Sequence, residues 1–237
     1  MEILKNIEII DLALYLKKEK ILIIADTHIG YEESLNKQGI LIPRTAFKDL
    51  IIRIEKILKK LPKLKKIIIN GDIKHEFGKI SETEWRNTLK FIDFLGKYSD
   101  EMILIKGNHD KILLPIAQKR DIKIVDSFKI DNILILHGDK APNKDQLKNI
   151  KTVLIGHEHP AVTIRDSSRQ EKYKCFLRGR YQKKVLIVQP SFNLVTEGTD
   201  ISQEKVISPL LRQDLSDFEV FVVSDRIYQF GKLKNLV

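Results

Sequence analysis

Histidine, aspartate and asparagine recur in short groups along this chain, and each group directly follows an apolar segment. The five groups are Asp26-Thr27-His28, Gly71-Asp72 with His75 three residues later, Gly107-Asn108-His109-Asp110, His137-Gly138-Asp139 and Gly156-His157-Glu158-His159. Imidazole nitrogens combined with carboxylate and amide oxygens, and no thiolate, suit manganese, iron or zinc. The residue types therefore predict a metal centre with mixed nitrogen and oxygen ligands.

The number of candidate ligands indicates two metal ions rather than one. Seven side chains qualify: Asp26, His28, Asp72, Asn108, His137, His157 and His159. If Asp72 bridges, the seven residues make eight contacts, which is four for each of two metals. Two ions about 3.5–4 Å apart are a known arrangement for in-line phosphoryl displacement. One histidine at a strand end is usually just hydrogen-bonded or exposed, but five such groups in the same setting are poorly explained that way.

The spacing inside two of the groups predicts chelating pairs. Residues i and i+2 of an extended segment point the same way, so Asp26 with His28, and His157 with His159, are expected to approach a metal together. Asp139 is a weaker candidate, for which a role in a turn is an equal alternative.

The apolar segments predict the elements that carry these groups. The strands expected before them cover residues 21–25, 67–69, 102–105, 133–136 and 153–155. A polar loop should follow the first strand, then an amphipathic helix from Phe47 to Leu61 and a second helix that begins at the capping box Ser81-x-x-Glu84. The last third of the chain contains strands without long helices. We therefore predict one α/β domain with two sheets over residues 1–237, in which parallel strands bring their carboxyl ends to one place.

The ordered groups closely resemble the signature of the calcineurin-like metallophosphoesterase superfamily: Asp-x-His, Gly-Asp, Gly-Asn-His-Asp, a lone histidine and Gly-His-x-His. The resemblance covers about Ile21 to His159. Together with Gly39-Ile40-Leu41-Ile42-Pro43 and Pro190-Ser191-Phe192-Asn193, the sequence is most similar to the small phosphoesterases related to SbcD-type repair nucleases and to DNA-ligase-associated phosphoesterases. The repair nucleases carry a DNA-capping domain after the catalytic core, for which this chain is too short.

The resemblance implies a four-layer αββα sandwich of two mixed β-sheets flanked by helices. It also implies that Asp26, His28, Asp72 and His159 hold one metal, and that Asp72, Asn108, His137 and His157 hold the other. Manganese is expected first, with iron, zinc or nickel as alternatives. The expected reaction is hydrolysis of a phosphoester.

Three further residues are predicted to act on the substrate. His109 would contact the phosphate and help to protonate the leaving oxygen, with Asp110 orienting its ring. His75 is a second candidate on the leaving-group side. A purely structural role for His109 is the alternative.

The net charge of the 237 residues is +10, with a pI of about 9.4, which favours a polyanionic partner. A basic stretch directly after His159 contains Arg165, Lys174, Arg178 and Arg180 among aromatic residues. These side chains could pair with phosphates while an aromatic ring stacks on a base. The alternative is an ordinary exposed hairpin. We expect nucleic acid as the partner, DNA before RNA, with a homodimer left open.

The sequence also excludes several classes of protein. It lacks a run of 18 apolar residues, so no membrane association is expected, and the amino terminus does not resemble a signal peptide. The single cysteine, Cys175, suits a reducing cytoplasm. A nuclease or phosphodiesterase related to DNA repair is the first hypothesis. A phosphoesterase for nucleotides or other small phosphoesters is the second, and a non-catalytic scaffold of the same fold is the third.

Overall fold

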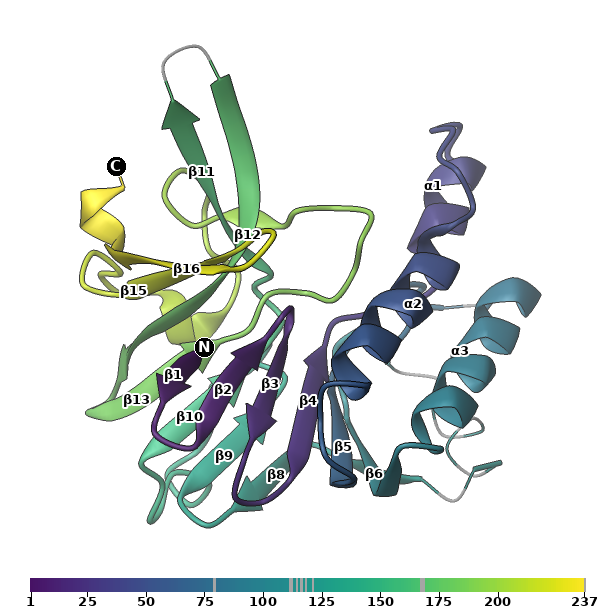
Figure 1. The fold of residues 1–237 in the computed structure, drawn as a ribbon, viewed down its shortest axis with the longest axis horizontal. Coiled ribbons are helices and arrows are strands. Elements are labelled where there is room, and N and C mark those ends of the chain that lie inside the picture. Colours follow the sequence, from purple (N-terminus) through teal and green to yellow (C-terminus); the bar gives the residue numbers. More distant parts are fainter. Residues whose placement is uncertain are drawn as a thin grey trace.

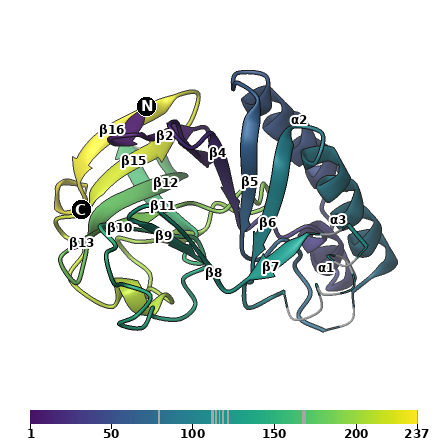
Figure 2. The ribbon, with the colours of Figure 1, turned by 90° about the horizontal axis from the view of Figure 1, so that it is seen from below.

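A computed structural model describes residues 1–78, 80–110, 113, 115, 117, 119–120, 122–166 and 169–236. Two β-sheets lie face to face, and the α-helices pack on the outside of the first sheet (Figures 1 and 2). The prediction of a mixed α/β fold built on two mixed sheets is confirmed. None of the helices in the described ranges is long and apolar enough to cross a membrane.

The first sheet has seven strands in chain order. They are β1 (Glu2–Leu4), β2 (Ile7–Ile10), β3 (Ala13–Leu16), β4 (Ile21–Ala25), β5 (Leu64–Asn70), β6 (Ser99–Ile105) and β7 (Lys123–Val125). The first four strands are antiparallel, whereas β4, β5, β6 and β7 run parallel. The carboxyl ends of β4, β5 and β6 therefore lie side by side at one edge.

The second sheet has nine strands, and its centre is again parallel. They are β8 (Ser127–Ile130), β9 (Ile133–Leu136), β10 (Thr152–Ile155), β11 (Pro160–Asp166), β12 (Arg169–Tyr181), β13 (Lys184–Val188), β14 (Thr199–Asp200), β15 (Glu219–Val223) and β16 (Ile227–Lys232). Strands β9, β10 and β13 are parallel neighbours. Strand β11 pairs with the first half of β12 as a hairpin that projects from the body of the sheet (Figure 1).

Three α-helices and two 3₁₀ turns complete the described residues. They are α1 (Tyr31–Lys37), α2 (Ala46–Leu58), α3 (Glu82–Leu95), η1 (Pro209–Leu211) and η2 (Leu233–Asn235). Helix α1 occupies the segment for which a polar loop was predicted. Its two larger apolar residues, Tyr31 and Leu35, are spaced like a helix but cover too few turns to show a period.

The burial pattern explains why the strands of both sheets appear as apolar segments in the sequence. Strand β4 is buried along its whole length because helices cover one face and the second sheet covers the other. In β10 the side chains alternate: Leu154 joins the core between the sheets, while Val153 and Ile155 join a second core on the outer face. Within the described ranges, that outer face is covered by turns around Leu147 and by η1 rather than by an α-helix.

Candidate metal centre

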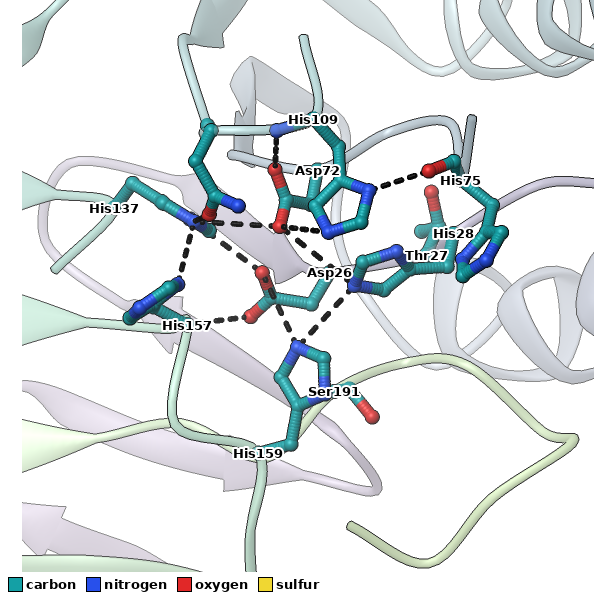
Figure 3. A network of polar contacts seen from close by, with 12 residues as sticks. Asp26, Thr27, His28, Asp72, His75, His109, His137, His157, His159 and Ser191 are labelled. Atoms are coloured by element: carbon teal, nitrogen blue, oxygen red, sulfur yellow. Dashed lines mark hydrogen bonds and ion pairs between the residues drawn. The ribbon is translucent and has the colours of Figure 1, made fainter. Parts of the chain in front are cut away.

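All five predicted groups meet at one edge of the sandwich, as Figure 3 shows. The groups of the first sheet follow β4, β5 and β6, whose parallel order makes their carboxyl ends adjacent. Those of the second sheet follow β9 and β10. Contacts between the sheets join the two sets, because the main-chain N–H of His157 donates to Asp26 Oδ2 at 2.9 Å.

The candidate ligands stand on an unusual backbone. Five of them have positive φ: Asp26 at 53°, His28 at 42°, Asp72 at 43°, His157 at 65° and His159 at 52°. Such left-handed conformations cost about 1–3 kcal/mol each for residues with a Cβ and cluster at functional sites. The backbone here directs the candidate ligands toward one another at the cost of local stability.

The structure tests the two chelating pairs that the sequence predicts. Asp26 and His28 do lie in one group, together with His159. The pairing of His157 with His159 is wrong, since His157 belongs to another group, with Asp72 and His137. The prediction assumed extended segments, whereas both pairs stand on left-handed residues, so an i, i+2 spacing does not fix which side chains converge.

The first group surrounds a point between β4 and the loop after β10. His28 Nε2 lies 3.3 Å from His159 Nε2, and His159 Nε2 lies 3.6 Å from Asp26 Oδ1. Asp72 Oδ2 is 3.7 Å from His28 Nε2. These are the four residues that the family resemblance assigned to one metal.

The second group lies on the other side of Asp72. His137 Nε2 is 3.4 Å from Asp72 Oδ2, 3.0 Å from Asn108 Oδ1 and 3.1 Å from His157 Nδ1. Because the same oxygen of Asp72 faces both groups, this carboxylate can bridge two ions.

Several polar atoms of the centre fit a metal better than any protein partner. Asp26 Oδ1 is buried and accepts no hydrogen bond from the described residues. The nitrogens of His28 and His159 face each other, as do those of His157 and His137. Facing lone pairs repel unless one nitrogen is protonated or both share a cation. The donor set thus fits two divalent cations of the kind that take nitrogen and oxygen ligands.

Burial and neighbouring charges set the ionisation of these groups. Burial lowers the pKa of His28 well below its usual value and, with the charge of His137, lowers the pKa of His157 to about 4. Burial opposes ionisation of Asp72, but contact with His137 outweighs it and lowers the pKa of Asp72. For His137 the contact with Asp72 outweighs burial and raises the pKa to about 9. A cation bound by His137 would therefore compete with a proton that Asp72 favours.

Glycines beside the candidate ligands are required by close packing. A Cβ at Gly107 would overlap the carboxylate and the main-chain nitrogen of Asp72. A Cβ at Gly156 would overlap the carboxylate of Asp26. Both glycines let one loop approach the ligand of another, which side chains would prevent.

His109 lies beside the centre with a defined ring orientation. Its main-chain N–H donates to Asp72 Oδ1 at 2.9 Å, and its Nδ1 contacts the main-chain carbonyl of His75. A carbonyl only accepts hydrogen bonds, so Nδ1 carries the proton. The opposite nitrogen, Nε2, then faces the metal centre, 3.9 Å from Asp72 Oδ2.

The predicted role of Asp110 is wrong. Its Oδ2 accepts from the main-chain N–H of Gly107 at 2.9 Å, and its Oδ1 has no hydrogen-bond partner among the described residues. Asp110 therefore shapes the loop, while the carbonyl of His75 orients the His109 ring. Sequence neighbours in a tight turn often point to opposite sides, which a motif cannot reveal. Burial and the charge of Asp72 raise the pKa of Asp110 to about 7.

His75 lies close to the same edge. Its ring stacks on Tyr31 of α1, with centroids 4.2 Å apart, and its Nδ1 is buried without a partner among the described residues. It forms a three-histidine group with His28 and His109. The structure thus brings His75 and His109 together at one edge of the metal centre.

Two buried charged residues hold the His75 loop, a role that the sequence did not predict for either of them. Lys74 is fully buried and donates from Nζ to the main-chain oxygens of Glu76 and, at 2.6 Å, His109. Glu84 of α3 accepts from the N–H groups of His75 and Glu76, both at 2.9 Å. Ser81 caps α3 as predicted, but Glu84 does not complete the capping box because its carboxylate holds this loop instead.

The basic residues after His159 do not form one patch. Arg165 is exposed on the projecting hairpin, which starts directly after His159. Lys174 points inward and donates to the carbonyl and hydroxyl of Ser191, at 3.1 and 2.8 Å. Burial lowers the pKa of Lys174 to about 7.

Arg178 and Arg180 lie at the other end of the long strand β12. Arg180 pairs in register with Val185, at the start of β13, whereas the metal centre lies beyond the end of β13. Arg178 forms an ion pair with Glu219. Arg178 and Arg180 therefore lie apart from Arg165, because the ten residues of β12 between Gln170, the partner of Arg165, and Arg180 span roughly 33 Å.

Comparisons with known proteins agree with this geometry. The model of the calcineurin-like phosphoesterase family matches residues 19–188. The crystal structure of the nuclease MPE from Pseudomonas putida has a TM-score of 0.64 at 22% identity, over 93% of this chain and 92% of that chain. No curated protein matches the chain.

Two further solved structures are similar at a lower level. A protein of unknown function from Aquifex aeolicus has a TM-score of 0.39 at 21% identity, over 59% of this chain and 78% of that chain. Vps29 from Entamoeba histolytica, complexed with zinc, has a TM-score of 0.39 at 12% identity, over 89% of this chain and 98% of that chain.

The family match spans most of the chain and includes every strand that carries a candidate ligand. Membership implies the use of two divalent metal ions, which agrees with two ligand groups that share Asp72. The chain belongs to the calcineurin-like phosphoesterase family and is a metal-dependent phosphoesterase.

Proposed function

We propose that this protein hydrolyses phosphodiester bonds in nucleic acid, with DNA preferred over RNA, as a nuclease related to DNA repair in the cytoplasm. The observation that carries the proposal is the pair of ligand groups around Asp72, with the Nε2 atom of His109 directed at the same point. The net charge of +10 and the exposed Arg165 on a hairpin next to His159 favour a polyanionic substrate. The structural neighbour from Pseudomonas putida is itself named a nuclease.

The seven candidate ligands divide between the two ions as the distances suggest. Asp26, His28 and His159 would hold one ion, Asn108, His137 and His157 would hold the other, and Asp72 would bridge them. Manganese is the ion that we propose first, with iron, zinc or nickel as alternatives. When bound, two such ions activate a water for in-line attack and neutralise charge on the phosphoryl oxygens.

His109 supplies the proton that the leaving oxygen needs. Because the His75 carbonyl holds Nδ1–H, the Nε2 atom is the one that can donate toward the substrate when the ring is cationic. His75 occupies the same side and would contact the leaving group through its ring.

A substrate panel tests the proposal directly. The protein would be reconstituted with manganese and given a DNA oligonucleotide, the matching RNA, a bis(nitrophenyl) diester and a nitrophenyl monoester. We expect cleavage of DNA and of the diester at higher kcat/KM than the monoester. Cleavage of the monoester alone would instead identify a phosphoesterase for small molecules. The Asp72→Asn variant, purified identically, controls for contaminating nucleases and should be inactive.

A further inference from the structure

Phe77 is a large apolar side chain placed at the rim of the metal centre. It is 52% exposed, and its ring centroid lies 3.6 Å from that of His109 at an interplanar angle of 32°. A planar ring that rests one face on His109 and remains half exposed presents its other face to solvent. Phe77 belongs to neither hydrophobic core, so packing of the interior does not account for it.

The backbone that carries Phe77 is held firmly from two sides. Glu84 accepts from the N–H of the preceding residue, Glu76, and Lys74 donates to the Glu76 carbonyl. Phe77 also ends a row of rings, since Tyr31 stacks on His75 and His75 lies 5.5 Å from His109. The exposed ring is therefore held in place rather than carried on a free loop.

We propose that Phe77 stacks on the nucleobase of the leaving nucleoside and so makes the enzyme selective for phosphodiesters that carry an unpaired base there. The inference rests on the proposed nuclease function. The position of His109 gives the reason. Phe77 covers the His109 ring, which donates a proton to the leaving oxygen. The group attached to that oxygen therefore passes the free face of Phe77. Stacking tolerates every base because each has a π-face.

The same placement predicts a preference for frayed or single-stranded ends. A base inside an intact duplex is already stacked and paired, so it must leave the helix to reach Phe77, at a cost of unstacking. Single strands and mismatched positions avoid that cost.

The test compares two dinucleotides that differ only in the base on the leaving side. One carries thymine there and the other a tetrahydrofuran abasic unit, and the readout is the ratio of their kcat/KM values. We expect the wild type to favour the base-bearing substrate by about 5- to 100-fold, the usual range for one stacked base. Phe77→Leu should bring the ratio close to one, and Phe77→Trp should preserve it.

A matched control is Phe230→Leu on β16, an exposed phenylalanine on a strand that carries no candidate ligand. It should leave the ratio and the basal rate unchanged. Binding of a dinucleotide with 2-aminopurine on the leaving side gives a second readout, because stacking on Phe77 should quench its fluorescence and Phe77→Leu should restore it. Thermal melting of each variant confirms that it is folded.

An unchanged ratio in Phe77→Leu, or an equal loss for both dinucleotides, overturns the stacking role while leaving the nuclease function intact. If the wild type cleaves neither dinucleotide but does cleave a phosphomonoester, the proposed function fails, and the inference fails with it.

Discussion

Asp72 is the side chain on which both ligand groups depend. Its Oδ2 lies 3.7 Å from His28 Nε2 and 3.4 Å from His137 Nε2, while its Oδ1 accepts from the His109 main chain. One carboxylate would thus join the two ions, and it also holds the main chain of His109, the proposed proton donor. The ring of His109 also lies edge-on to the ring of His28, with centroids 4.8 Å apart. Single substitutions can test whether metal assembly and proton transfer are separable.

Substitution of these two residues should separate the two roles. Asp72→Asn should lower metal content and rate together, because a neutral amide is a poor bridge between dications. His109→Gln should keep the metal content and lower the rate by about 10²–10⁴-fold, the usual contribution of a positioned proton donor. Metal analysis and kcat for both variants check this. Loss of metal from His109→Gln would show that His109 is a ligand or a structural support.

The buried side chain of Lys174 predicts a pH effect on stability. Burial holds the pKa of Lys174 at about 7 in the folded protein, against the ordinary lysine value of 10.5. At pH values between these two pKa values, the Lys174 amine is protonated in the unfolded chain but neutral in the folded protein. The contribution of Lys174 to stability therefore rises with pH and is lowest below pH 7. The melting temperature of wild type minus that of Lys174→Met should therefore increase from pH 6 to pH 9.5. A difference that is flat across this range would show that Lys174 stays charged in the fold.

At the scale of elements, the centre depends on loops that approach one another more closely than side chains normally allow. The loops after β5 and β6 meet where Gly107 touches Asp72, and Glu84 of α3 holds the loop after β5 from behind. Helix α1 adds Tyr31 against His75. The strands deliver the groups to one edge, and these contacts set the final positions.

Gly107→Ala should therefore damage the centre without changing a ligand. The added Cβ overlaps the Asp72 carboxylate, so we expect metal affinity to fall by about 10–100-fold, the loss typical of disturbed support around a metal ligand. Gly78→Ala is the matched control, because a Cβ there meets nothing within 4 Å. Isothermal titration with manganese measures both. Wild-type affinity in Gly107→Ala would mean that the loops can separate freely.

At the scale of the whole molecule, two sheets face each other (Figure 2). They enclose one core of apolar side chains and share one edge at which the candidate ligands meet. Asp26 from the first sheet accepts from the His157 N–H of the second. Gln189, at the end of β13, donates to the carbonyls of Leu12 and Ile23 at 3.0 and 3.1 Å. Ions held between the sheets would add a further link between them.

Removal of metal should lower the stability of the entire sandwich. An ion present at 100 times its Kd stabilises the folded state by about 2.7 kcal/mol, which for a chain of this size raises Tm by about 5–10 °C. We expect two ions per chain at saturation in manganese, and a fall in Tm with a chelator. Asp72→Asn should show little response to the chelator. A saturating value of one ion would contradict the two-ion arrangement.

The charge distribution predicts which arginines bind nucleic acid. Arg165 and Arg169 are exposed on the hairpin beside the metal edge, whereas Arg180 is exposed at the opposite end of β12. Affinity for duplex DNA should fall with rising salt, by about 0.9 log unit per log unit of salt for each phosphate neutralised. Arg165→Ala with Arg169→Ala should flatten that slope, and Arg180→Ala should not. Equal slopes for all variants would remove the hairpin from the binding surface.

The sequence by itself determined the chemistry of the centre and the order of its elements. The types of the seven candidate ligands, their places after apolar segments and the helix that begins at Ser81 are all visible along the chain. These features are local, because residue type and hydrophobic period depend on neighbours within one element. The family resemblance rested on the same local information.

Only the tertiary structure decided which side chains share an ion and which residues support them. His157 faces His137 whereas His159 faces His28, and Asp110 accepts from the Gly107 N–H rather than contacting the His109 ring. These outcomes depend on φ angles and on contacts between loops far apart in the sequence. Residue spacing carries no such information, since the distance between two loops is set by the packing of the sheets beneath them.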